Sequence, residues 1–415
     1  MKLSNIKIQS KVLMIICVPL LALFFAIATL LLQENAVRVE NTQLAELTNT
    51  APEIGTFLQE LQKERALSVQ FANAKEDAVS GARDRLAKQR TATNAALLTY
   101  KAGITIILNG SFDKSVKDAI QTANGKIGEL TAFRKQVDDK AVDGAQAAKT
   151  YTETNAAVIA IISRMASLST DTDISMQLIA YYNLVLIKEK SGIERAVGAN
   201  GLGQGMFSSE IFARFVGLSA QQDVHLAIFK DRSAPDIAKF YEATVNGQPV
   251  DEVVRIRKAI IAAGTGGSVD SSITSSYWVD VTTQRIDLLR KVEVKAVESL
   301  ISLVESTKNS SLSRFFTELS FSAATLLITV FTSIFMVRSI TVPLAGANKG
   351  LQELANDNLE YQVVGDTRKD EIGDISRAML VFKQDALERR RMAALQEEEN
   401  KAKLARTARV EALVN

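Results

Sequence analysis

The sequence predicts an all-α membrane protein in which two transmembrane helices flank a large helical domain. Only 5 of its 415 residues are proline and 6% are aromatic, and a chain with so little proline can form long uninterrupted helices. Two apolar stretches, residues 12–32 and 319–337, contain no charged residue and are long enough to cross a bilayer. The formal net charge of +2 gives no reason to expect a nucleic acid as a partner.

The first apolar stretch, residues 12–32, is predicted to be transmembrane helix 1. Its 21 residues span about 30 Å at ~1.5 Å per residue, which matches the hydrocarbon core of a membrane. Three lysines precede it, so residues 1–11 are expected to form a cytoplasmic amino terminus. The alternative is a signal peptide that is cleaved near residues 26–28, but the apolar run continues past that point.

The second apolar stretch, residues 319–337, is predicted to be transmembrane helix 2. It contains six Ser and Thr residues, which a membrane helix tolerates because each hydroxyl can bond to its own backbone. A buried helix of a soluble protein is the alternative. If both stretches cross a bacterial inner membrane, residues 33–318 lie in the periplasm and everything after Arg338 lies in the cytoplasm.

The segment 33–318 is predicted to be a periplasmic domain that is helical nearly throughout. The intervening pieces are about 20 to 50 residues long, which favours antiparallel helices in a bundle. A last helix from about Tyr277 to Thr307 is expected to lead into transmembrane helix 2. Turn-forming residues interrupt the segment at 109–111, at the glycines of 198–205, which are expected to bend the chain, and at 233–235, 246–249 and 264–267.

Two stretches of this predicted domain share a short pattern around an arginine. LQKERALSVQFANA (61–74) contains Glu64-Arg65-Ala, and IKEKSGIERAVGANG (187–201) contains Glu194-Arg195-Ala. Apolar and small residues recur around each arginine at steps of three and four, which puts each arginine on the inward face of its helix. A buried guanidinium is costly unless a carboxylate or a bound anion compensates its charge.

Two interpretations of the pattern are open from the spacing alone. In the first, Glu64 and Glu194 pair with arginines across the bundle and the pattern is structural. In the second, Arg65 and Arg195 bind a small anion. Arginine suits that role because its planar fork of donors matches a flat oxyanion and because it does not lose its charge.

The two stretches resemble the nitrate- and nitrite-sensing (NIT) domain of bacterial receptors. So do GMFSSEIFARFVGLSAQQDVHLAIF (205–229) and YWVDVTTQRIDLL (277–289), which follow in the order expected of the family. The resemblance covers roughly residues 50–300. It implies a pair of four-helix bundles that binds nitrate or nitrite through arginines.

By this resemblance, Arg65 and Arg195 are the main candidates for binding the anion. Arg214, in the third stretch, is a further candidate, and Lys63 beside the first arginine could add positive potential. One departure concerns the residue after the first Glu-Arg, which is commonly glycine in the family and is Ala66 in this chain. That departure bears on how closely the backbone can approach a ligand.

Metal and cofactor sites are not expected. Cys17 is the only cysteine and lies within the first apolar stretch, and His225 is the only histidine. A site built from cysteine and histidine ligands therefore lacks its residues. We likewise identify no catalytic residues and expect a protein that is not an enzyme.

After Arg338 the sequence predicts two helices joined by a linker. Pro343 is expected to start the first helix, since its missing N–H would be unsatisfied there anyway. The Asn-Asp-Asn sequence at 356–358 is expected to end that helix. A second helix is expected to begin near Asp370, where acidic residues favour a helix amino terminus. The residues predicted for its inner face are Ile372, Ile375, Met379 and Phe382.

This arrangement of helix, linker and helix, with its proline and its Asp-Glu-Ile-Gly, resembles a HAMP domain over residues 338–390. The resemblance implies a parallel homodimeric four-helix coiled coil that carries motion from a membrane helix to an output module. The alternative is a pair of surface amphipathic helices without a relay role.

Residues 391–415 are expected to begin a cytoplasmic signalling helix. Their closing RTARVEALVN resembles the lead-in of methyl-accepting chemotaxis proteins. We therefore expect the chain to be a truncated part of a longer receptor.

As a whole, the sequence resembles a bacterial transmembrane chemoreceptor of the methyl-accepting type. The resemblance implies a signal transducer whose partners are nitrate or nitrite outside, membrane lipid, a second copy of the chain, and a chemotaxis kinase and adaptor complex inside. Two alternatives are open. The chain could be the sensor part of a histidine kinase or nucleotide cyclase, or a receptor that docks a periplasmic protein and has no small-molecule ligand.

Overall fold

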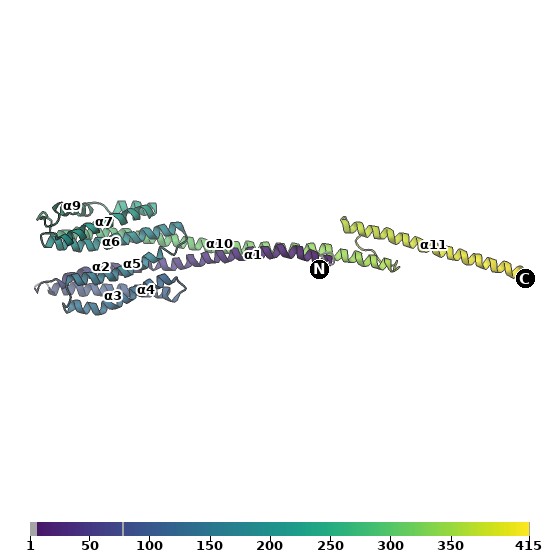
Figure 1. Cartoon of the computed structure of the whole chain (residues 1–415), viewed down its shortest axis with the longest axis horizontal. Helices are drawn as coiled ribbons and strands as arrows, with labels where there is room; N and C mark the ends of the chain where they lie inside the picture. The colour runs from purple at the N-terminus through teal and green to yellow at the C-terminus, as the bar shows by residue number, and fades with distance from the viewer. Residues whose placement is uncertain (1–5, 77–78, 415) are drawn as a thin grey trace. The chain divides into compact units, whose positions relative to one another are not determined.

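The computed structural model describes residues 6–76 and 79–414, and the regular secondary structure of these residues is entirely helical (Figure 1). The prediction of an all-α protein is confirmed. The chain divides into two compact units, one of Gln33–Phe315 and one formed by the segments on either side of it. The helices are α1 (Ile8–Asn49), α2 (Ala51–Ala72), α3 (Val79–Asn109), α4 (Lys114–Asp138), α5 (Gly144–Met165), α6 (Thr172–Gly203), α7 (Ser209–Arg232), α8 (Pro235–Thr244), α9 (Gln248–Ala263), α10 (Ser275–Ala355) and α11 (Glu371–Val414).

Side-chain caps fix where several of these helices begin. The side chains of Asp113, Asp143, Asp171 and Ser208 accept hydrogen bonds from backbone N–H groups in the first turns of α4, α5, α6 and α7. Each cap satisfies a donor that the helix itself leaves unpaired. Pro235 occupies the first position of α8, where a missing N–H has no cost.

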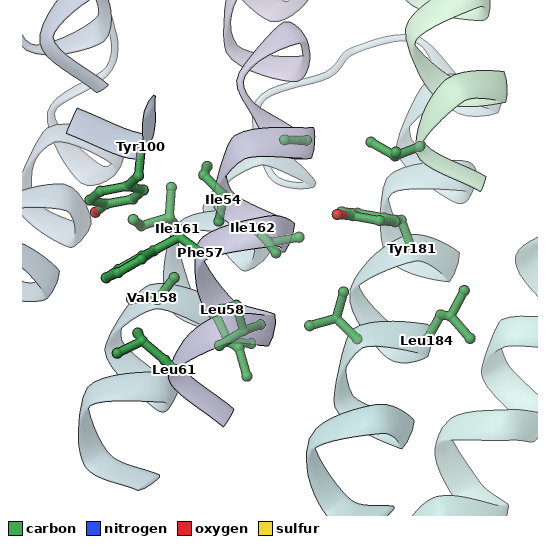
Figure 2. Packing of buried hydrophobic residues seen from close by; sticks show 14 of the residues in the cluster. Ile54, Phe57, Leu58, Leu61, Tyr100, Val158, Ile161, Ile162, Tyr181 and Leu184 are labelled. Atoms are coloured by element: carbon green, nitrogen blue, oxygen red, sulfur yellow. The ribbon is translucent and has the colours of Figure 1, made fainter. Parts of the chain in front are cut away.

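The unit Gln33–Phe315 contains two helical bundles. The first consists of α2, α3, α4 and α5, and the second of α6, α7, α9 and α10. Figure 2 shows how α2 joins them: its Leu58 and Ile54 lie between Val158 of α5 on one side and Tyr181 of α6 on the other. All four side chains are buried in one continuous core, so the two bundles are packed against each other and not merely linked.

The second bundle has a further core at the end where α10 begins. Trp278 is fully buried there against Phe215. An added Cβ at Gly198 would lie 2.4 Å from Trp278 Nε1, and one at Gly201 would lie 2.4 Å from Phe207. Of the glycines predicted to bend the chain, Gly198 and Gly201 therefore lie within α6 and let aromatic rings approach the helix closely. Gly205 follows the end of α6 at Gly203 and has a φ of +73°, as a bend requires.

Two helices of the described chain, α1 and α10, are long and apolar enough to cross a membrane. Large apolar side chains are exposed along both: Ile15 and Phe25 are 72% and 70% exposed in α1, and Phe321 and Phe331 are 75% and 72% exposed in α10. Exposed apolar side chains of this kind are compatible with a membrane crossing.

Pro343 does not start a helix, which corrects the prediction. It lies inside α10, which runs without interruption to Ala355. A proline inside a helix leaves the carbonyl four residues earlier without its backbone donor. That carbonyl belongs to Ser339, and it accepts a hydrogen bond from Arg368 Nη2 at 3.4 Å. The guanidinium therefore replaces the missing N–H.

The last helix begins where it was predicted, and one residue of its predicted inner face is buried within the chain. α11 starts at Glu371, and the Asp370 side chain accepts from the Gly373 N–H at 3.1 Å. Met379 is buried in a small cluster with residues of α10, as predicted. Ile375 and Phe382 are 37% and 55% exposed within the single chain, so a single chain does not cover the rest of the predicted inner face.

Candidate functional site

Glu64 points into the core of the first bundle and neutralises arginines there. Its Oε1 and Oε2 accept hydrogen bonds from Arg134 Nε and Nη2 at 2.7 Å each, and the Tyr151 hydroxyl donates to Oε1 at 2.6 Å. Arg90 Nε lies 3.5 Å from the same carboxylate. Burial and the charge of Glu64 raise the pKa of Tyr151 far above its ordinary value, so this hydroxyl stays a donor.

Glu194 has the same function in the second bundle. It accepts from Arg257 Nε and Nη2 at 2.7 and 2.6 Å, and from Gln222 Nε2 at 2.8 Å. A second arginine of this core, Arg285, donates to Ser191 Oγ at 3.0 Å and to Gln222 Oε1 at 2.9 Å. Burial lowers the pKa of Arg285 to about 10.

Both glutamates therefore pair within their own bundles, as the structural interpretation of the pattern expected. The arginine that follows each glutamate points elsewhere, because successive helical residues are rotated by about 100°. Both arginines lie in what we call the interbundle seam, which is lined by α2 and α5 of the first bundle and by α6 and α10 of the second.

Arg65 is buried in this seam, with 6% of its surface exposed. Its Nη1 and Nη2 donate to the two carboxylate oxygens of Glu189 on α6, and Nη1 also donates to Thr152 Oγ1 at 3.0 Å. Gln62 Nε2 donates to the same carboxylate at 2.7 Å. An added Cβ at Gly192 would lie only 3.0 Å from Arg65 Nη2, so the glycine leaves room for the guanidinium.

Arg195 lies in the same seam without a paired carboxylate. Its Nη1 donates to Thr283 Oγ1 at 2.8 Å, and among the described residues it forms no ion pair. Burial and the positive charge of Arg65 lower the pKa of Arg195, and Asp287 opposes them only in part. Trp278 Nε1 donates to the Arg195 carbonyl at 3.0 Å and holds the backbone at this point.

The two halves of the seam share their arginine and its threonine partner but differ in the charge of one nearby residue. Each arginine donates to a threonine of the last helix of its bundle, Thr152 or Thr283. Six residues before each arginine stands Gln59 in α2 and Glu189 in α6. The Gln59 Oε1 atom is buried, and no residue of the described chain donates to it. One half therefore has a carboxylate where the other has an uncharged amide.

The ion pairs of the seam leave one guanidinium uncompensated. Arg65 pairs with Glu189, whereas Arg195 has no carboxylate of the described chain within ion-pairing distance, and Asp287 offsets the positive surroundings of Arg195 only in part. A net positive charge in a buried place is costly. One monovalent oxyanion would neutralise it and would also give the free donors of Arg195 an acceptor.

The other two predicted site residues lie outside the seam. The Lys63 side chain is 48% exposed and pairs with Glu60 at 2.7 Å. Arg214 lies on the exposed face of α7, next to the buried Phe215. The structure therefore brings together Arg65 and Arg195 but neither of the other candidates.

A cavity of about 310 Å³ between α5 and α6 adjoins the seam. Thr152 and Glu189, the two partners of Arg65, form part of its wall. Most of the remaining wall is apolar, and Lys190 and Arg164 add positive charge. The cavity therefore reaches the two residues that bind the Arg65 guanidinium.

A buried ion pair lies farther along α10, between the seam and the apolar stretch. Lys188 of α6 and Glu293 of α10 pair with each other, and each side chain is only 1% exposed. Arg290 Nη1 donates to Glu293 Oε1 at 2.6 Å. Burial lowers the pKa of Lys188, although the charge of Glu293 opposes the shift.

Sequence reasoning missed Glu189, Thr152, Thr283 and Lys188 as parts of this region. Helical periodicity places Glu189 one and a half turns before Arg195, but it does not say that this acid crosses to the other bundle. Thr283 lies within the stretch 277–289 that resembles the family, so that stretch contained a usable signal. No group of three or more metal-binding side chains occurs among the residues that the structure describes.

Comparison with known proteins identifies the family of this chain. A family model described as nitrate and nitrite sensing (NIT) matches residues 56–301. The nitrate regulatory protein of Klebsiella oxytoca is 25% identical over 179 residues, which are 43% of this chain and 44% of that protein. A probable chemoreceptor, y4sI, of Sinorhizobium fredii (strain NBRC 101917 / NGR234) is 42% identical over 67 residues, which are 16% of this chain and 9% of that protein. The chain thus spans less than half the length of either relative.

One solved structure has the same fold. The structure of the NasR transcription antiterminator aligns with a TM-score of 0.60 at 19% identity, over 87% of this chain and 98% of that one.

Proposed function

This chain belongs to the nitrate and nitrite sensing (NIT) family, and from that premise we propose that it is a membrane receptor whose Arg65 and Arg195 bind nitrate or nitrite in the interbundle seam. The predicted NIT resemblance of residues 50–300 is confirmed by the family match over 56–301. The membrane topology, the HAMP relay and the chemotaxis output remain predictions, and they complete the proposal.

The unpaired charge of Arg195 is the observation on which the proposal rests. Two arginines share the seam with one carboxylate, Glu189, and the charge of Arg65 already disfavours the charged form of Arg195. Nitrate and nitrite carry one negative charge and present a flat set of oxygens. The planar donors of a guanidinium match such an anion geometrically as well as electrostatically. The threonine partners, Thr152 and Thr283, accept from the two arginines and fix the direction of each guanidinium in the seam.

The proposed topology follows from the apolar stretches of α1 and α10. Crossing a bacterial inner membrane twice would place the seam in the periplasm and both chain ends in the cytoplasm, in line with the lysines before residue 12. The helix α10 forms part of the seam at Thr283 and also carries the second apolar stretch. A bound anion can therefore change the position of a helix that is continuous through the predicted membrane crossing.

The proposed output is non-enzymatic signalling by a homodimer. Ile375, Phe382 and Leu351 are exposed in the single chain, and a parallel four-helix coiled coil between two copies of residues 338–390 would cover apolar side chains of this kind. The likeness to a probable chemoreceptor supports a chemotaxis kinase and adaptor complex as the partner in the cytoplasm.

Calorimetry on the full chain in detergent micelles tests the ligand. Sodium nitrate is expected to bind with a stoichiometry of one per seam, and Arg195→Ala is expected to abolish binding because it removes the guanidinium that lacks a carboxylate. Nitrate at 100 times its Kd is expected to raise the free energy of unfolding by about 2.7 kcal/mol, since it binds only the folded chain.

Arg214→Ala is the matched control for this test. It removes the same charge from the same unit, but from an exposed position of α7, so nitrate affinity is expected to stay unchanged. If the unmodified chain does not bind nitrate or nitrite, the proposed function is wrong. If Arg214→Ala abolishes binding and Arg195→Ala does not, the seam is not the site.

A further inference from the structure

Glu189 is shared between the arginine seam and the cavity. Its carboxylate receives both terminal nitrogens of Arg65, and the same residue lines the cavity between α5 and α6. Only 4% of its surface is exposed. The side chain therefore stands between the solvent-facing cavity and the guanidinium that is proposed to hold the anion.

We propose that Glu189 is an internal competitor of the ligand: its carboxylate occupies the fork of Arg65 when the seam is empty and turns into the cavity, toward Lys190, when an oxyanion takes its place. This inference rests on the proposed function of the seam. It adds a residue that sets the affinity for the anion without contacting it in the bound state.

The carboxylate and the anion compete because they need the same donors. A carboxylate is a flat pair of oxygens, and it receives Arg65 through two parallel N–H groups, which is the arrangement that nitrate or nitrite would require. Two negative oxyanions beside one another in a buried place repel strongly. Gln62 also donates into this position, and its neutral amide N–H can serve either acceptor.

The cavity is large enough to hold the displaced carboxylate of Glu189. Its volume of about 310 Å³ is several times the ~30 Å³ share of one water in the liquid. Lys190 lines the same cavity, is half-buried, and has no ion pair among the described residues. Positions 189 and 190 are rotated by about 100° on the helix, so the two side chains enter the cavity from adjacent directions.

The asymmetry of the seam supports this assignment. The position equivalent to Glu189 in the other half is Gln59. Its side chain is uncharged and cannot form an ion pair with an arginine. Arg195 is therefore unoccupied and available for the first contact with an oxyanion. The second contact, with Arg65, requires the carboxylate of Glu189 to leave.

Calorimetric titration of the full chain in detergent micelles with sodium nitrate tests the proposal. Glu189→Gln keeps the shape of the side chain and removes its negative charge, so the Kd for nitrate is expected to fall by roughly 5- to 100-fold. Glu189→Asp, which retracts the carboxylate from Arg65 by one methylene, is expected to lower the Kd as well. If Glu189→Gln does not fold, the Kd of the Glu189→Asp variant tests the proposal instead.

The part played by Lys190 is tested by a double-mutant cycle. Lys190→Gln alone is expected to raise the Kd for nitrate, because the displaced carboxylate loses its new partner. In the Glu189→Gln background, the same change is expected to leave the Kd unaltered. Equal effects in both backgrounds would contradict the assigned destination of the carboxylate.

Glu153→Gln is the control for a general change in charge. It removes one negative charge from an exposed position of α5 next to Thr152, so the Kd is expected to stay within about twofold. A Glu189→Gln chain that binds nitrate as weakly as the unmodified chain, or more weakly, overturns the competitor while the proposed function stands. A failure of the unmodified chain to bind nitrate overturns the proposed function itself.

Discussion

At the scale of single residues, the adjacent members of each Glu-Arg pair have different functions. Glu64 and Glu194 neutralise arginines inside their own bundles, and Arg65 and Arg195 lie in the seam between the bundles. The inward position of Arg65 could be predicted from the three- and four-residue spacing of its neighbours. Its pairing with Glu189 could not, because that contact joins residues 124 positions apart, and no local pattern specifies it.

The pairing of Glu64 predicts a large loss of stability when it is removed. Glu64→Ala leaves the guanidinium groups of Arg134 and Arg90 in the first bundle without their buried carboxylate. The free energy of unfolding is therefore expected to fall by about 3–5 kcal/mol, as measured by urea denaturation of the full chain.

An exposed ion pair of the same bundle provides the comparison. Glu129 pairs with Lys126 one turn away, and its side chain is 64% exposed. Glu129→Ala is expected to cost less than about 1 kcal/mol, because water screens and replaces this pair. Similar losses from both variants would mean that the buried network does not stabilise the first bundle.

At the scale of helices, the sequence predicts a break between helices where glycine, proline or asparagine marks it, and misses a break that only a capping residue marks. The Gly, Pro and Asn turns at 109–111, 233–235, 246–249 and 264–267 all coincide with observed breaks. The breaks that precede α3, α5 and α6 were not predicted. Two of them are marked by a helix-capping Asp with no glycine or proline in the preceding loop, at Asp143 and Asp171. Capping residues occur in many other settings, so they are weaker signals than glycine and proline.

The close approach of Trp278 to α6 predicts an effect of substituting a glycine. Gly198→Ala places a Cβ only 2.4 Å from Trp278 Nε1, which is closer than van der Waals contact, so the ring or the helix must shift. Overpacking of this kind is expected to cost about 1–3 kcal/mol. Because Trp278 also holds the Arg195 carbonyl, nitrate binding is expected to weaken in the same variant.

Gly217 in α7 is the matched glycine. It is helical, and a Cβ added there meets nothing within 4 Å. Gly217→Ala is expected to raise the free energy of unfolding by about 0.5–1 kcal/mol, since alanine loses less backbone freedom in a helix. Thermal unfolding followed by circular dichroism compares the two variants. A stabilised Gly198→Ala chain would contradict the packing described for Trp278.

At the scale of the whole molecule, one helix connects the seam to the segment after the second apolar stretch. The sequence predicted separate helices on either side of Pro343, because a proline usually marks a helix start or a break. In the continuous α10, the Ser339 carbonyl that Pro343 leaves without a backbone donor accepts from Arg368, 29 residues away in sequence. A single-sequence pattern cannot include a donor supplied by tertiary contact.

The packing of α1 against α10 predicts a cross-link that reports on the ligand. Asn41 Nδ2 donates to Ser311 Oγ at 2.7 Å. Cysteines at both positions, in a chain whose Cys17 is replaced by serine, are therefore expected to form a disulfide under mild oxidation. Nitrate is expected to change the rate of this reaction if it moves α10 relative to α1, and non-reducing gel electrophoresis measures the rate.

A pair placed on the outward face is the control for the cross-link. Cysteines that replace Leu98 of α3 and Ser311 should not form a disulfide. Leu98 points outward from the first bundle and is 72% exposed, whereas Ser311 faces α1. A rate for the Asn41 and Ser311 pair that is the same with and without saturating nitrate would contradict motion of α10 against α1.

The buried ion pair between Lys188 and Glu293 holds one point of α10 in place, so that the helix can tilt about this point more easily than it can slide. Sliding the helix along its axis would separate two buried charges, which is among the costliest changes a protein interior can undergo, whereas tilting about Glu293 keeps them together. Along α10, Thr283 lies about 15 Å before Glu293 and Phe315 lies about 33 Å after it, at ~1.5 Å per residue. A displacement of about 1 Å at Thr283 would thus be roughly doubled at Phe315 when the helix tilts as a rigid body about Glu293.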